Sequence, residues 1–235
     1  MKTTRLIVLA TSLIFAGAAA ATAQPPAPTA YVELNVAGQT SSSTVGSSST
    51  FSLFGETGST SFSQSVGKGL LFDAGGGYFF RKNFAIGLSL SMFSRSPAAT
   101  VAVSTPDPIA FNAFTVTTSN PNLKQTELSG HLKLSYLVPI TDKMSVTVFV
   151  GPSLVRLTKE IATASIVNGA PQIATASQSG TGFGAHGGAD FTYLFTPRVG
   201  GGIFVRYVGV AVDLPAAAAI PVGGFQGGVG LRVRF

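Results

Sequence analysis

The sequence predicts an all-β protein, an antiparallel up-and-down transmembrane β-barrel of about eight strands. Residues 225–235 alternate apolar and non-apolar side chains and end on Phe235. Only 10% of the chain is charged and the mean hydropathy is +0.41, yet beyond residue 23 no apolar run approaches the roughly 18 residues of a spanning helix. Short and long connections also alternate between the candidate strands. Because lipid offers backbone groups no hydrogen-bond partner, a period of two in a membrane requires a closed sheet.

The first 23 residues have the pattern of a secretory signal peptide. Lys2 and Arg5 precede an apolar stretch, and Ala21-Thr22-Ala23 forms an A-x-A cleavage site. The alternative, a membrane anchor, is disfavoured because the apolar run is short for a span and two prolines follow it at once. We therefore expect a signal peptide over 1–23 and one barrel domain over 24–235.

The composition excludes several functional classes. Without Lys2 and Arg5, the chain carries 13 basic and 9 acidic residues, a net charge of +4, and no cluster of basic residues is interleaved with aromatics. Nucleic acid is therefore not an expected partner. The absence of cysteine leaves no disulfide framework and no thiolate metal site. No glycine-rich stretch is followed by the Lys and Ser/Thr of a phosphate loop. We expect no cofactor and no metal.

The first three strands are expected at 31–38, 70–80 and 84–93. In each, apolar residues alternate with polar or small ones, so that one face meets lipid and the other lines the lumen, the interior of the barrel. Glu33 of the first strand and Asp73 of the second fall on the lumen face.

The fourth and fifth strands are expected at 125–138 and 144–154. The fourth sets five leucine, tyrosine and valine positions against a polar face that carries Glu127, His131 and Lys133. The fifth is valine-rich on one face and small or hydroxylated on the other, as expected for a strand between lipid and a narrow lumen.

The last three strands are expected at 183–193, 199–211 and 225–235. The sixth is rich in glycine, and the eighth places arginines on the face opposite its apolar residues. The ionisable residues that alternation assigns to the lumen in these strands are His186, Asp190, Arg206, Arg232 and Arg234.

The connections alternate in length. Tight turns are expected at 81–83, 139–143 and 195–198, and long loops rich in Ser, Thr, Ala and Pro at 39–69, 94–124, 158–182 and 212–224. Outer-membrane barrels have short periplasmic turns and longer extracellular loops, so both termini are expected in the periplasm. The strand ends on that side carry the aromatic residues expected of an interfacial girdle, namely Tyr31, Phe80, Phe84, Tyr136, Tyr193, Phe195 and Phe235.

Three motifs carry a resemblance to a known family. They are Gly77-Tyr78-Phe79-Phe80 with Asn83-Phe84-Ala85-Ile86-Gly87, Val150-Gly151-Pro152-Ser153-Leu154, and Phe195-Thr196-Pro197-Arg198 followed by Arg206-Tyr207. With them the chain resembles the small, eight-stranded bacterial outer-membrane β-barrel proteins of the OmpA, OmpX and OmpW type. The resemblance covers the whole mature chain, but the sequence lacks the C-terminal domain of OmpA.

The resemblance implies a role for the C-terminal segment. In this family the terminal Phe and the alternating apolar residues are read by the barrel-assembly machinery. The corresponding residues here are Phe225, Val229, Leu231, Val233 and Phe235.

The lumen is the first place to look for chemistry. Alternation assigns ten ionisable residues to it: Glu33, Asp73, Glu127, His131, Lys133, His186, Asp190, Arg206, Arg232 and Arg234. An eight-stranded barrel has an interior just wide enough for side chains, so these charges are expected to pair and fill it. The sharper alternative is a polar conduit or gate. The two histidines lie on different strands without neighbouring ligands, so a metal or catalytic role is disfavoured. Ser129 shares the face of His131, a weak hint of a lipid-modifying enzyme.

The sequence thus favours a non-enzymatic, monomeric outer-membrane protein with a structural or surface-interaction role. A narrow channel for small or hydrophobic solutes is the alternative, and a lipid-modifying enzyme is a weaker third. A secreted β-sandwich would instead be released into the medium. The expected partners are outer-membrane lipid and lipopolysaccharide, the assembly machinery, and an extracellular ligand bound through the long loops.

Overall fold

The computed structural model describes residues 29–40, 43–66, 68–112, 114–167, 170–215 and 217–235. The expected signal peptide, 1–23, lies outside these residues. Within them, no helix is long and apolar enough to cross a membrane. The strands of the described ranges are β1 (Ala30–Gln39), β2 (Ser43–Leu53), β3 (Glu56–Val66), β4 (Gly69–Arg81), β5 (Phe84–Arg95), β6 (Ala99–Pro106), β7 (Phe114–Ser119), β8 (Gln125–Pro139), β9 (Met144–Val167), β10 (Ala170–Leu194), β11 (Val199–Leu214) and β12 (Ala217–Arg234).

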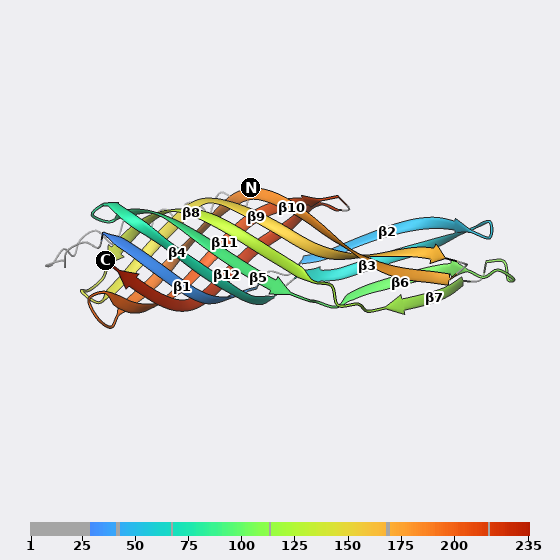
Figure 1. Ribbon diagram of the computed structural model, residues 1–235, viewed down its shortest axis with the longest axis horizontal. Helices are drawn as coiled ribbons and strands as arrows, with labels where there is room; N and C mark the ends of the chain where they lie inside the picture. The colour runs from blue at the N-terminus through green and yellow to red at the C-terminus, as the bar shows by residue number, and fades with distance from the viewer. Residues whose placement is uncertain (1–28, 41–42, 67, 113, 168–169, 216) are drawn as a thin grey trace, which may run out of the picture.

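Eight of these strands close into a barrel in the order β1-β12-β11-β10-β9-β8-β5-β4 (Figure 1). All neighbours are antiparallel, and β1 closes the sheet by pairing with β12 on one side and β4 on the other. Leu34, for example, lies opposite Leu231 and Ala74. Closure pairs the backbone without leaving a sheet edge, as a membrane requires. The predicted eight-stranded antiparallel barrel is confirmed.

The two faces of the barrel strands follow the predicted alternation. On β5 exposed and buried residues alternate over ten positions; Leu88 is 58% exposed on the outer surface, whereas Ala85 and Ser89 are buried in the lumen. The C-terminal strand behaves alike, with Phe225 and Leu231 outside and Arg232 inside. An apolar band therefore surrounds the barrel.

The long connections are not loops, contrary to expectation. Strands β2, β3, β6 and β7, within 39–69 and 94–124, form a second sheet in the order β2-β3-β6-β7. Residues 158–182 lengthen β9 and β10, and 212–224 lengthen β11 and β12. Their Ser, Thr and Val residues suit a pleated surface, and cross-strand pairing, which local composition does not reveal, gives them partners.

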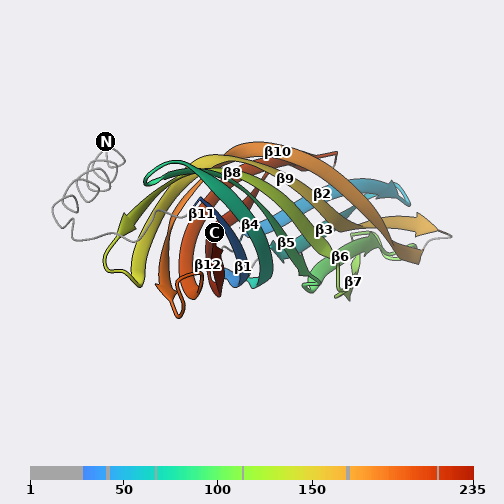
Figure 2. The same ribbon diagram turned by 60° about the vertical axis from the view of Figure 1, so that its left-hand side comes forward.

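The second sheet extends the molecule along its long axis, away from the short turns (Figures 1 and 2). We call the end with the turns at 81–83, 139–143 and 195–198 the short-turn end, and the other the long-strand end. The second sheet packs on the barrel extension through an apolar cluster formed by Phe62, Ala99, Val101, Val103, Leu123 and Ala162 of β9. An extension of paired strands thus replaces the predicted loops.

Aromatic side chains gather on the outer surface near the short-turn end, with one exception to the prediction. Phe84 packs between Phe80 and Tyr136, with ring centroids 6.3 and 4.8 Å apart. Tyr31, assigned to the girdle, instead lines the lumen and packs on Phe79 at 5.7 Å. Its position on the face of Glu33 explains this, because residues two apart on a strand point the same way.

Candidate functional site

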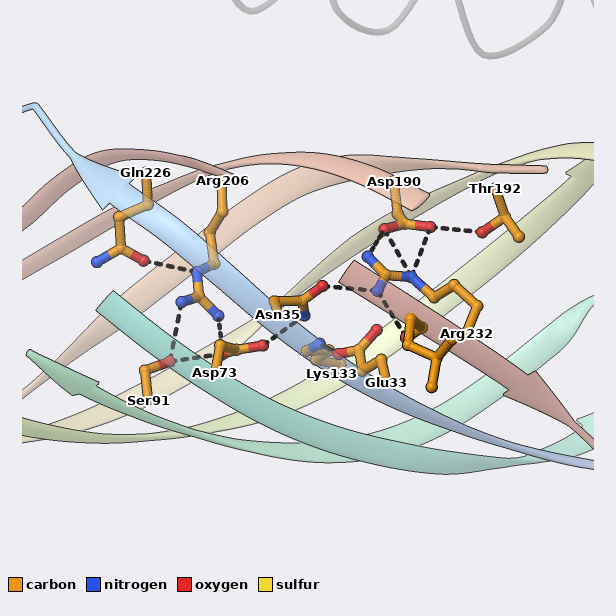
Figure 3. Close-up of polar contacts among 11 residues, drawn as sticks. Glu33, Asn35, Asp73, Ser91, Lys133, Asp190, Thr192, Arg206, Gln226 and Arg232 are labelled. Atoms are coloured by element: carbon orange, nitrogen blue, oxygen red, sulfur yellow. Dashed lines mark hydrogen bonds and ion pairs between the residues drawn. The ribbon is translucent and has the colours of Figure 1, made fainter. Parts of the chain in front are cut away.

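Three buried ion pairs cross the lumen (Figure 3). Lys133 of β8 contacts Glu33 of β1, Arg232 of β12 contacts Asp190 of β10, and Arg206 of β11 lies 3.1 Å from Asp73 of β4, measured from Nη1 to Oδ2. No side chain of the three pairs is more than 9% exposed. Each pair joins two strands that are not neighbours in the sheet.

Neutral side chains complete the environment of Arg206. Its Nε donates to Gln226 Oε1 at 2.9 Å and its Nη2 donates to Ser91 Oγ at 2.9 Å. Ser91 in turn donates to Asp73 Oδ2 at 2.6 Å, and Gln226 donates to Gln39 Oε1 at 2.8 Å. The guanidinium of Arg206 thus donates one hydrogen bond from each of its three nitrogens, and these bonds offset the cost of burying its charge.

Asn35 links this cluster to the next one (Figure 3). Its Nδ2 donates to Asp73 Oδ1 at 2.9 Å, and its Oδ1 accepts from Arg232 Nη1 at 2.6 Å. Arg232 Nε lies 3.1 Å from Asp190 Oδ2, and Thr192 donates to Asp190 Oδ1 at 2.7 Å. The ion pairs of Asp73 and Asp190 therefore belong to one hydrogen-bonded network across the barrel.

The other four predicted residues of the network make no ion pair in the described part of the chain. Glu127 accepts from Gln125 Nε2 at 2.6 Å, and Arg234, near the short-turn end, donates to Ser145 Oγ at 2.6 Å. His131 and His186 lie together, with ring centroids 4.9 Å apart.

A serine joins the two histidines, but it is not the predicted one. Ser153 Oγ lies 2.8 Å from His131 Nδ1 and 2.9 Å from His186 Nδ1. Ser129, two residues from His131 on the same strand, was the predicted neighbour. Ser153 lies directly opposite His131 in the β8–β9 register, and directly opposite residues are closer than residues two apart on one strand. The alternation of residues 144–154, which places Ser153 on the lumen face, is the sequence feature that could have indicated this serine.

Little free volume remains around the ion pairs. A cavity of about 40 Å³ lies among Tyr31, Lys133, Phe149 and Arg232. Since one water needs about 10–15 Å³ of such volume, this space holds a few waters and no larger solute.

Towards the long-strand end, the lumen becomes apolar. The buried residues of this apolar chamber are Val155, Leu157 and Ile161 of β9, Val208, Val210, Val212 and Leu214 of β11, and Ile220 and Val222 of β12. Between β9 and β11, the inward positions of β10 include Gly182 and Gly184. A Cβ at Gly182 would lie 2.8 Å from Val212 Cγ2, so the β11 side chains occupy that space. Much of the chamber lies in residues predicted to be loops, which hid its alternation.

One charged residue interrupts the apolar chamber. Lys159, on the same face of β9 as Leu157 and Ile161, is 1% exposed. It was not predicted, because 158–182 was expected to be a loop.

The far end of the second sheet exposes apolar side chains on two turns. Phe54 is 56%, Ile109 94% and Phe111 80% exposed. Asp107 Oδ1 accepts from the backbone N–H groups of Ile109 and Ala110 at 2.7 and 3.0 Å, and these bonds lower the pKa of Asp107. The two turns meet where the backbone N–H of Asn112 donates to Glu56 Oε1 at 3.0 Å. We call Phe54, Ile109 and Phe111 the apolar tip.

In the described ranges, no three His, Asp or Glu side chains come together as metal ligands would.

Comparisons with known proteins agree with this architecture. The family model of the outer membrane protein beta-barrel domain matches residues 6–232. The outer membrane protein OprG from Pseudomonas aeruginosa is 13% identical, with a TM-score of 0.50 over 90% of this chain and 98% of its own. The outer membrane protease OmpT from Escherichia coli is 11% identical, with a TM-score of 0.50 over 92% and 99%. Such low identities concern the fold alone. No curated protein sequence matched the chain.

Proposed function

The chain belongs to the outer membrane protein β-barrel domain family, and from that premise we propose that it is a non-enzymatic surface-interaction protein whose barrel is closed to solutes. The observation that carries the proposal is the contrast between the two ends of the molecule. Buried ion pairs fill the lumen near the short-turn end, while a second sheet of four paired strands presents exposed residues at the other.

We infer a closed lumen because opening it would require a large free energy to separate the ion pairs. Passage of a solute requires that Arg206–Asp73 and Lys133–Glu33 separate, because each of these pairs joins two strands that have two others between them in the wall. Breaking one buried pair costs roughly 3–5 kcal/mol, since a charge is left unpaired. The barrel then serves as a monomeric membrane anchor. Its apolar outer band contacts outer-membrane lipid and lipopolysaccharide.

The second sheet supplies the interaction surface. With the short turns and termini in the periplasm, as is usual for such barrels, it projects from the cell. Its strands and turns, 43–66 and 99–122, carry no Lys or Arg, and the carboxylates of Glu56 and Asp107 accept backbone hydrogen bonds. The apolar tip is thus the most distinctive part of an otherwise Ser- and Thr-rich surface. Exposed elements on a rigid scaffold are where binding sites concentrate.

The geometry of the serine and histidines supports a non-enzymatic role. Ser153, His131 and His186 are at most 3% exposed, whereas a nucleophile must meet its substrate. Their contacts tie β8, β9 and β10 together inside the barrel. OmpT is a protease by name, but its likeness to this chain concerns the fold.

A second candidate is a narrow channel for hydrophobic solutes. The apolar chamber favours it, because aliphatic walls inside a barrel are compatible with apolar guests. A solute that passed through the barrel would still have to cross the ion pairs nearer the short-turn end.

Single-channel recording of the refolded protein in a planar bilayer separates the two candidates. We expect a silent, correctly inserted barrel, and discrete openings only after Arg206→Ala or Glu33→Ala, each of which breaks one of these ion pairs. Arg198→Ala, in an exposed turn, is the matched control. Reproducible conductance of the wild type would overturn the closed barrel and favour the channel.

A further inference from the structure

The last strand of the second sheet, β7, is an edge strand whose outer side has no partner strand among the described residues. On its inner side it pairs with β6, in a register that runs from Pro106 opposite Phe114 to Val101 opposite Ser119. It lies at the outer margin of the sheet in Figure 1. Because the backbone groups of a strand point alternately to its two sides, part of the N–H and C=O groups of β7 face away from β6.

The side chains of β7 do not block this free edge. Residues 114–118 are all exposed, Phe114 at 47% and Val116 at 63%. The strand has the sequence FTVTTS, without a charged residue, proline or glycine, and its register with β6 runs without a shift. Natural proteins usually protect an edge with lysine, proline or a bulge, because an unprotected strand of β-branched and aromatic residues pairs readily with another strand. The edge of β7 therefore remains open to a further strand.

The sequence of β7 suits antiparallel pairing with a second copy of itself. A two-fold axis perpendicular to the sheet keeps every side chain on its own face, so residues an even number of positions apart lie opposite each other. With the axis at Val116, this residue lies opposite its own copy. Phe114 then lies opposite Thr118, and Thr115 lies opposite Thr117. Aromatic–β-branched and Thr–Thr pairs are among those that stabilise antiparallel strands.

The charges of the second sheet do not oppose such pairing. Within 43–66 and 99–122 the charged residues are Glu56 and Asp107. Both carboxylates accept backbone hydrogen bonds at the turns of the far end, and neither residue belongs to β7. Two copies of β7 can therefore approach without placing like charges opposite each other.

The direction of β7 determines where a second copy would lie. Strand β6 leads away from the barrel and β7 leads back towards it, so both follow the long axis of the molecule (Figure 1). Antiparallel pairing of two β7 strands places the two barrels at opposite ends of the assembly. Barrels in one outer membrane point the same way, whereas barrels in two facing membranes point in opposite directions. The pairing is therefore one between neighbouring cells.

We propose that β7 pairs antiparallel with β7 of a second copy on a neighbouring cell, so that two four-stranded sheets join edge to edge. The proposal rests on the proposed surface role, because it requires the second sheet to project from the cell, and it names a second copy of this chain as the partner. A six-residue strand forms few hydrogen bonds, each worth about 0.5–1.5 kcal/mol, so a single contact is weak. Many copies on two facing surfaces bind together and supply avidity.

Single cysteines test the register, because the chain itself has none. Two cell populations that display the protein with different epitope tags are mixed and oxidised with copper phenanthroline. Val116→Cys is expected to give disulfide-linked dimers that carry both tags, since Cβ atoms directly opposite each other lie about 4.5–5.5 Å apart. Phe114→Cys, which faces Thr118 and not its own copy, should give at least about fivefold less. Thr50→Cys, at an exposed position on the other edge strand, β2, is the control and should give no such dimer.

Charges at Val116 give a second test, read as aggregation of the cells. Wild-type cells should aggregate, whereas Val116→Lys and Val116→Asp cells should each stay dispersed, because two like charges then lie opposite each other at the two-fold axis. A mixture of the Val116→Lys and Val116→Asp populations should aggregate again, since the opposed charges now attract. Thr50→Lys should aggregate as the wild type does, and heat-modifiable gel mobility verifies that each variant is folded.

Three results would overturn the pairing. They are disulfide dimers that carry one tag only, equal cross-linking at Val116, Phe114 and Thr50, and Lys and Asp populations that stay dispersed when mixed. Adhesion of the same cells to hydrophobic glass is measured in parallel. Normal adhesion without cross-linking through β7 would overturn the pairing alone, whereas cells that neither adhere nor cross-link would overturn the surface role as well.

Discussion

Arg206 and Asp73 lie opposite each other in the lumen, 3.1 Å apart and no more than 2% exposed, although two strands separate β11 from β4 in the wall. Such a pair holds the cross-section of the barrel as well as neutralising charge. We expect Arg206→Met alone to lower the free energy of unfolding by about 3–5 kcal/mol, because Asp73 is left buried and unpaired. Urea unfolding in lipid vesicles measures this.

Arg206→Met with Asp73→Leu should recover most of that loss, since no unpaired charge remains. Arg198→Met, at an exposed turn, is the control and should change stability by less than about 0.5 kcal/mol. A double variant as unstable as the single one would contradict a pairing role.

Gly182 on β10 is expected to be needed for barrel closure. A Cβ there would lie 2.8 Å from Val212 Cγ2 and would also meet the backbone oxygen of Ala211. Gly182→Val should therefore prevent the compact, heat-modifiable form seen on gels. Gly187→Val is the matched change on the outer face of the same strand, where the atom nearest to an added Cβ is 3.6 Å away, and this variant should fold normally. Normal folding of Gly182→Val would show that β11 can move aside.

Ser153 is expected to contribute to stability through both histidines. Ser153→Ala removes the hydrogen bonds to His131 Nδ1 and His186 Nδ1 and should cost about 1–3 kcal/mol, because buried ring nitrogens lose their partner. Ser129→Ala, on the face of His131, is the comparison, and urea unfolding should place it closer to the wild type. A larger loss of stability in Ser129→Ala than in Ser153→Ala would instead support Ser129, the serine predicted from sequence, as the partner of the histidines.

Stability should rise with pH through Lys159. The folded state lowers the pKa of this residue from 10.5 to about 8, so between these values the unfolded chain binds more protons than the folded one. The free energy of unfolding therefore increases as pH rises from about 8 to 10, once burial of the charge no longer opposes folding. Lys159→Met should be more stable at neutral pH and lack this rise. Glu127→Gln, which removes the charge of a lumen carboxylate that makes no ion pair, should keep the rise.

We expect that Phe54 serves binding through its exposed ring and not the stability of its turn. Its φ of 54° and the 79° of Gly55 place both residues of the two-residue turn in the left-handed region, where Asn-Gly is preferred. Phe54→Asn should raise the free energy of unfolding by about 1 kcal/mol. It should also weaken the adhesion of cells that express the protein to the surface to which wild-type cells adhere. Phe114→Asn, which removes an exposed ring from an ordinary strand position, should bring no gain in stability. Unchanged adhesion in Phe54→Asn would remove Phe54 from the binding surface.

Alternation over a few residues was enough to predict the barrel, because the period of two is a local property of each strand. It placed residues such as Glu33, Asp190 and Arg206 in the lumen, where the structure has them buried. It failed in 39–69 and 158–182, where small polar residues give no contrast between two faces. Lys159 went unnoticed there for that reason.

The sequence by itself determined the fold class, the number of barrel strands, the short turns and the lumen face. Only the tertiary structure decided which charges pair, that Ser153 and not Ser129 joins the histidines, that the expected loops form a second sheet, and that Lys159 is buried alone. The physical reason is that alternation depends on neighbours in the chain, whereas register, barrel closure and cross-lumen contacts depend on residues far apart in sequence, such as Arg206 and Asp73, 133 positions apart.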